Sequence, residues 1–275
     1  MSVQADVIRA HRVDTGRVTL NVREIGEGPL MIFLHGITSN AAVWDPITLN
    51  LKGDFRCVAV DQRGHGLSDK PDTGYSARDL AQDVLALIKT LNAGPAVIVG
   101  HSLGARNGVV AATLDPELVK SVVAVDFTPY IEKEVLDALE SRVNGGDRLF
   151  KRREDIEAYL QDRYQKMPPD AIRRRAMTAF KEVEGGFRPL AYAKAMSLTA
   201  QGLREDLEPA YRDVACPVLV VRGAESKLVS EAALEKTRRL RPDLPVLVVE
   251  NTDHYVTEEA PEVSARAIRE FARTA

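Results

Sequence analysis

Short apolar runs alternate with amphipathic segments along this chain. Seven runs are rich in β-branched residues and are bounded by Gly, Pro or charged residues, a pattern that predicts β-strands. These strands are expected at residues 18–25, 30–34, 55–60, 96–99, 121–126, 217–222 and 245–250.

The segments between most of these strands carry apolar residues at helical spacing. Helices are predicted after the N-cap residues Ser76 and Ser230, directly after residue 102, and from Pro261 onward. Strands that alternate with helices are typical of a mostly parallel sheet with helices on both faces, so the expected fold class is α/β. The Gly26–Pro29 stretch, GEGP, is interpreted as a hairpin-type turn.

Residues 127–207 interrupt this rhythm. They contain no convincing strand and are interpreted as several helices, separated by NGG, MPPD and EGGFRP. Between residues 141 and 188 there are twelve Lys or Arg and eight Asp or Glu, although the whole chain has a net charge of −3. We therefore predict a locally basic helical cap at 127–207, inserted between two parts of the core at 1–126 and 208–275.

Composition narrows the class of protein further. The 275 residues are 45% hydrophobic and 28% charged, which is ordinary for a globular protein. No apolar run approaches the ~20 residues of a membrane span, and the first residues form no apolar leader, so a cytoplasmic protein is expected. Cys57 and Cys216 lie in apolar runs and are expected to be small buried residues. We expect no metal, organic cofactor, nucleic acid or membrane partner; a homodimer is compatible with the sequence.

Ser102 is the candidate nucleophile. It lies in Gly-His-Ser-Leu-Gly, residues 100–104, between a predicted strand and a predicted helix. This context is the one in which a strained turn exposes a serine hydroxyl for nucleophilic attack. A structural serine in a tight turn is the alternative.

His254 is the favoured general base among five histidines. His101 is adjacent to the serine and cannot easily reach its oxygen, while His35 and His65 lie in turns upstream and His11 lies near the start of the chain. His254 follows the last apolar strand, on a loop expected at the same sheet edge as the serine. A surface histidine with a structural partner is the alternative.

Two carboxylates compete for the role of the acid. Asp126 ends an otherwise apolar strand, where a carboxylate is costly to bury unless it is paired, and an imidazolium is such a partner. Glu225 lies on the loop after the penultimate strand, where such an acid is often found, although the position three past Gly223 holds Ser226. Asp126 is preferred; capping of the segment at Thr128 is its alternative role.

The backbone N–H groups of Ile37 and Leu103 are the expected oxyanion-hole donors. Ile37 lies in the loop after the strand at 30–34, and Leu103 directly follows the candidate nucleophile. Asp61, Arg63 and His65, after the next strand, are expected to hold their loop rather than to react.

The segments LHGI, DQRGHGLSD, GHSLGA and DHY, in this order, resemble the α/β-hydrolase superfamily along essentially the whole chain. A narrower resemblance rests on VDFTPYIEKEVLDALESRVNGG, YRDVACPVLVVRGAESKLVS and LRPDLPVLVVENTDHYV, which are similar to the family of (E)-2-(acetamidomethylene)succinate hydrolases of bacterial vitamin B6 breakdown. That resemblance implies a triad of Ser102, Asp126 and His254.

The same resemblance implies how the substrate is held. Arg142 and Arg163 would bind the two carboxylates of a small dicarboxylate, and Tyr164 and Tyr255 would line the site. The implied activity is amide hydrolysis that gives acetate, succinate semialdehyde, ammonia and carbon dioxide. Most other cap arginines, at positions 152, 153 and 173–175, are expected to be solvated helix faces. The alternatives are an esterase, a lactonase or a carbon-carbon bond hydrolase acting on another small acidic substrate, or a ligand receptor without turnover.

Overall fold

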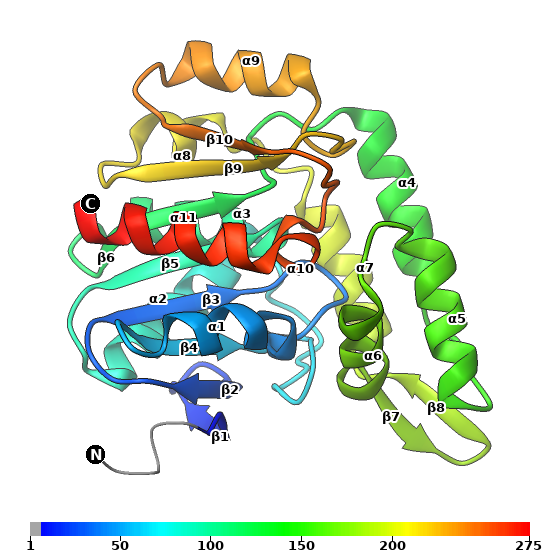
Figure 1. Cartoon of the computed structure of the whole chain (residues 1–275). Coiled ribbons are helices and arrows are strands. Elements are labelled where there is room, and N and C mark those ends of the chain that lie inside the picture. Colours follow the sequence, from blue (N-terminus) through cyan, green and yellow to red (C-terminus); the bar gives the residue numbers. More distant parts are fainter. Residues whose placement is uncertain (1–6) are drawn as a thin grey trace.

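The computed structural model describes residues 7–275 and contains an eight-stranded sheet (Figure 1). Residues 1–6 lie outside the described residues. They belong to the N-terminal segment in which the sequence predicts no apolar leader. The strand order is β1-β2-β4-β3-β5-β6-β9-β10, and all seven predicted strands are confirmed. Their bounds are Thr19–Ile25 (β2), Leu30–Leu34 (β3), Arg56–Val60 (β4), Ala96–His101 (β5), Val119–Val125 (β6), Val218–Gly223 (β9) and Val246–Val249 (β10).

The sheet has one further strand at its edge, β1 (Arg9–Asp14), which pairs antiparallel with β2. Its side chains are mostly exposed and polar, so it has no apolar pattern from which it could be predicted. The hairpin interpretation of GEGP is wrong, because β4 lies between β2 and β3 in the sheet. Gly26 there has φ +82°, and a Cβ at this position would lie 2.4 Å from the Phe55 carbonyl oxygen.

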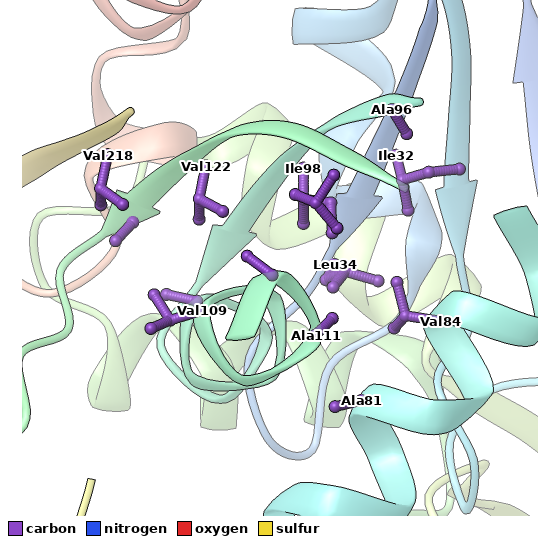
Figure 2. Packing of buried hydrophobic residues seen from close by; sticks show 14 of the residues in the cluster. Ile32, Leu34, Ala81, Val84, Ala96, Ile98, Val109, Ala111, Val122 and Val218 are labelled. Atoms are coloured by element: carbon purple, nitrogen blue, oxygen red, sulfur yellow. The ribbon is translucent and has the colours of Figure 1, made fainter. Parts of the chain in front are cut away.

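Helices cover both faces of the sheet. On one face lie α2 (Ala77–Leu91), α3 (Leu103–Leu114), α8 (Glu208–Asp213) and α9 (Glu231–Leu240). Figure 2 shows part of this layer, where α3 packs against the strands that carry Ile98 and Val122, and Ala111 of α3 lies towards Val84 of α2. On the other face lie α1 (Asp45–Leu51), α11 (Pro261–Thr274) and the short helices Ala41–Trp44 and α10 (Val256–Glu259).

The parallel register aligns the carboxyl ends of the central strands. His101, the last residue of β5, pairs with Val125, the last residue of β6, and Val125 pairs with Val221 of β9. The segments that follow these strands therefore leave the sheet at one edge, which is where ligand sites of such sheets form.

The segment predicted as a cap lies to one side of the sheet and is green to yellow in Figure 1. Its helices are α4 (Lys133–Asn144), α5 (Arg153–Arg163), α6 (Pro169–Thr178) and α7 (Ala193–Gly202). The expectation that it contains no strand is wrong, since β7 (Phe180–Val183) and β8 (Gly186–Pro189) form a hairpin. EGGFRP was interpreted as a helix separator, but it supplies the hairpin turn, with Gly185 at φ +83° and Gly186 at φ +143°. Across the described part of the chain, no helix is long and apolar enough to cross a membrane.

Candidate active site

Ser102 occupies a strained turn between β5 and α3. Its φ of 53° and ψ of −115° lie outside the regions that L-residues prefer, a conformation that costs about 1–3 kcal/mol. The flanking glycines allow the turn to pack closely. A Cβ at Gly104 would lie 2.1 Å from the Leu34 carbonyl oxygen, and one at Gly100 would lie 2.3 Å from the Gly104 backbone. The turn thus presents the serine at the carboxyl edge of the sheet.

Asp126 and His254 form a hydrogen-bonded pair at the same edge. The distance from His254 Nδ1 to Asp126 Oδ2 is 2.7 Å, and the Asp126 side chain is fully buried. The Ser226 hydroxyl also donates to Oδ2, at 2.6 Å, and the Gly223 N–H donates to Oδ1, at 3.0 Å. These three hydrogen bonds offset the cost of burying the Asp126 carboxylate.

Ser102 and His254 line one cavity of about 690 Å³ that is partly open to solvent. Their side chains form no hydrogen bond with each other in this structure; such bonds often tighten only when substrate is bound. His101 Nε2 donates to the His254 backbone carbonyl at 2.7 Å and so holds the loop that carries His254. Burial lowers the pKa of His101 well below its usual value, so this ring is neutral.

The other titratable candidates are engaged elsewhere. His35 and His65 are buried, and burial lowers their pKa values to about 4 and about 3. His11 is exposed, with Nε2 3.5 Å from a Glu24 oxygen. The Glu225 carboxylate pairs with Lys166 of the cap and has 53% of its side chain exposed. Of the two carboxylates predicted as candidates for the triad acid, Asp126 is the one that is hydrogen-bonded to His254.

The predicted oxyanion-hole residues both lie close to Ser102. Leu103 is the first residue of α3, so its N–H has no partner within the helix. Ile37 lines the cavity, and a Cβ at the preceding Gly36 would lie 3.4 Å from Ser102 Cβ. Within the described residues neither N–H has a hydrogen-bond acceptor.

Both predicted substrate-binding arginines line the cavity that contains Ser102. Arg142 and Arg163 both do so, and neither forms an ion pair with a described carboxylate. Tyr255 lines the same cavity, whereas Tyr164 lines a second cavity inside the cap. The two tyrosine rings meet edge to face, with centroids 4.7 Å apart.

Arg175 is the functional candidate that the sequence missed. It was expected on a solvated helix face together with its neighbours, but it is 6% exposed and lines both cavities. Its Nε donates to Glu258 Oε1 at 2.9 Å, so a cap helix and a core helix share a buried ion pair. Although burial raises the pKa of Tyr164, Arg175 and the two other cavity arginines bring it below its usual value. This end of the site is therefore electropositive.

Glu259 supports the loop that carries His254. Its Oε2 accepts a hydrogen bond from the Asp253 N–H at 2.8 Å, and the Asp253 carboxylate accepts one from the Tyr255 N–H at 3.0 Å. Burial, together with the neighbouring Asp253 carboxyl, raises the pKa of Glu259 to about 8. The fold thus favours the protonated form, and the stability that this proton provides is lost as the pH rises from about 4.5 to about 8.

Glu259→Gln should remove this pH dependence, because the amide keeps the acceptor for the Asp253 N–H and cannot ionise. We expect the Tm of the variant to exceed that of the wild type at pH 8.5, and the difference to shrink towards pH 5. Thermal unfolding at both values measures it, with Glu262→Gln, at an exposed position of α11, as the matched control. An equal difference at both pH values would contradict the assignment.

Comparison with known proteins provides independent evidence. The model of a family described as "Alpha/beta hydrolase family" matches residues 31–267. A 2-(acetamidomethylene)succinate hydrolase of Mesorhizobium japonicum is 61% identical over 98% of this chain and 99% of its own. A crystal structure of E-2-(acetamidomethylene)succinate hydrolase, also 61% identical, covers 97% of this chain and all of its own with a TM-score of 0.96. An (E)-2-((N-methylformamido)methylene)succinate hydrolase of Acinetobacter baylyi is 26% identical over 93% of this chain and 95% of its own.

Proposed function

The chain belongs to the alpha/beta hydrolase family, and from this premise we propose that it hydrolyses the amide of (E)-2-(acetamidomethylene)succinate with a Ser102, His254 and Asp126 triad. The observation that carries the proposal is one cavity that holds a serine and a histidine together with two arginines lacking carboxylate partners. The relative and the solved structure at 61% identity are both named as hydrolases of 2-(acetamidomethylene)succinate, which supports the same substrate.

The charge of the cavity arginines favours a substrate with two carboxylates. Arg175 is neutralised by Glu258, whereas Arg142 and Arg163 have no described carboxylate partner. Each guanidinium can offer a carboxylate two parallel N–H donors, so a dianion with two separated carboxylates would satisfy both arginines. A neutral ester or amide would leave both charges uncompensated.

In the first half of the proposed reaction, His254 takes the proton of Ser102 as the hydroxyl attacks the acetyl carbonyl, and Asp126 stabilises the imidazolium. The N–H groups of Ile37 and Leu103 receive the oxyanion; such a donor is worth about 3–4 kcal/mol. His254 then protonates the departing nitrogen. The bond from the carbonyl carbon to nitrogen breaks and an acetyl-enzyme remains.

In the second half, His254 activates a water molecule that releases acetate and restores Ser102. The other product is a primary enamine, which tautomerises to an imine and is hydrolysed to an aldehyde and ammonia. The carboxyl group β to the aldehyde is then lost as carbon dioxide, which leaves succinate semialdehyde. The cytoplasmic location, the homodimer and the division at residues 126 and 207 stay predictions from the sequence.

Arg142→Ala and Arg163→Ala should each lower kcat/KM for this substrate by about 100-fold, the size of a pair of charge-assisted hydrogen bonds. Acetate release measures the effect. Hydrolysis of the uncharged ester p-nitrophenyl acetate should change little, because it needs the triad but not the arginines.

Arg148→Ala is the matched control, since Arg148 is an exposed cap arginine that lines neither cavity. It should leave kcat/KM for the dicarboxylate unchanged. Wild-type kinetics in both cavity variants would overturn the proposed role of these arginines. Absence of acetate release from the wild-type protein, with p-nitrophenyl acetate still cleaved, would overturn the substrate but not the triad.

A further inference from the structure

The cap contains a second, smaller cavity of about 80 Å³ that the proposed reaction does not use. It lies among α4, α5, α7 and the β7–β8 hairpin, and its lining includes Phe150, Tyr159, Leu160, Phe180 and Met196. Apolar or aromatic walls are usual in sites that bind small molecules. A substrate with two carboxylates and a short amide has no group that would fill such walls.

The second cavity meets the one that contains Ser102 at a wall of three arginines. Arg142, Arg163 and Arg175 line both cavities. Asp147 is the acidic residue in the described lining of the cap cavity, and its carboxylate pairs with Arg188. The cap cavity is thus apolar over most of its surface and positively charged at one end.

These arginines have unused hydrogen-bond donors. Arg163 donates from Nη1 to the Tyr159 hydroxyl at 3.1 Å, but its Nε is buried without a partner. Arg175 bonds Glu258 through Nε and Nη2, which leaves Nη1 without a described acceptor. Arg142 and Arg163 have no described carboxylate partner, so an anion at this end of the cavity would compensate their charge.

We propose that the cap cavity binds a monocarboxylate with an aromatic body, whose carboxylate occupies the shared arginines and whose ring lies among the aromatic side chains. The aromatic lining at Phe150 and Phe180 suits a ring, since aromatic pairs gain energy beyond the area they bury. Because the arginines are shared, the occupant excludes a dicarboxylate from the site of Ser102. Binding of the monocarboxylate does not depend on the proposed function, whereas exclusion of the dicarboxylate rests on it.

Calorimetric titration with 3-phenylpropanoate tests the binding directly. On the wild-type protein, 3-phenylpropanoate should bind about tenfold or more tightly than either 3-phenylpropanol, which lacks the charge, or propanoate, which lacks the ring. Equal binding of the acid and the alcohol would overturn the proposal, and so would no binding of the acid. Because no variant is needed, folding defects cannot obscure this result.

Two variants of the same hairpin then locate the site. Phe180→Ala removes a half-buried ring from the cavity lining and should weaken 3-phenylpropanoate binding about tenfold. Phe187→Ala removes a half-buried ring outside the lining and should leave the affinity unchanged. Equal losses in both variants would overturn the location.

Kinetics tests the exclusion. 3-Phenylpropanoate should raise KM for the dicarboxylate without lowering kcat, and it should leave cleavage of p-nitrophenyl acetate unchanged. If the acid binds but KM is unaffected, the shared arginines are not what it occupies. If the protein does not cleave the dicarboxylate at all, the proposed function fails while calorimetry still decides the binding.

Discussion

Replacing Ser102 by alanine should lower kcat for acetate release by about a millionfold, the loss seen when a serine nucleophile is removed from a comparable triad. The strained turn and the flanking glycines position this hydroxyl at the edge of the sheet, in the cavity shared with His254. Without this hydroxyl no acetyl-enzyme can form. The oxyanion-hole N–H groups and the arginines that bind the substrate provide only a small residual rate.

Ser39 provides the matched control, because it is the other serine in the described lining of the same cavity. Ser39→Ala should keep kcat within about twofold of the wild type, since its hydroxyl has no described hydrogen-bond partner to lose. An organophosphonate probe should label the wild-type protein at Ser102 and fail to label Ser102→Ala. Acetate release by Ser102→Ala at a substantial fraction of the wild-type rate would remove this serine from the mechanism.

The central part of the fold could be predicted because its signals are local. The inner strands are buried on both faces, so they appear in the sequence as uninterrupted apolar runs, as in β3. The edge strand β1 and the β7–β8 hairpin bury little, and their polar residues carry no such signal. Sheet order is also not local, which is why the turn at Gly26 was mistaken for a hairpin.

The position of Ser102 could be predicted, but its acid partner could not be fixed from the sequence. The strand-turn-helix pattern around the serine spans a few residues. In contrast, the contacts that distinguish the two carboxylates join distant segments. Ser226 donates to Asp126 across 100 residues, and Lys166 of the cap pairs with Glu225 across 59.

Arg175 shows how a local signal can be overlooked. Ala171, Ile172 and Ala176 are buried on α6, so helical spacing places Arg175 on the same buried face. A run of three arginines nevertheless looks like a solvated surface, because the sequence does not show that Glu258 lies opposite, 83 positions later. Burying an arginine is costly without such a partner, and the partner of Arg175 comes from a different part of the fold.

Asp126→Asn should lower kcat by about ten-thousandfold, the loss reported for the same change in a comparable triad. The carboxylate accepts the His254 Nδ1–H at 2.7 Å, which leaves Nε2 as the atom that can take the serine proton. An amide at position 126 fills the same space, but it can turn its NH₂ group towards the imidazole. The ring would then be held in the wrong tautomer, and its cation would lose a buried counter-charge.

The comparison with Glu225→Gln decides between the two carboxylates. Glu225 pairs with Lys166 where both side chains are partly exposed, an arrangement worth at most about 1 kcal/mol. Its replacement should therefore keep kcat within about twofold, measured by acetate release under the same conditions as Asp126→Asn. If Glu225→Gln were crippling while Asp126→Asn retained activity, the hydrogen bond from His254 to Asp126 would have a structural role only. Because asparagine has nearly the volume of aspartate, equal Tm values for wild type and Asp126→Asn would assign the loss of rate to charge and tautomer rather than to packing.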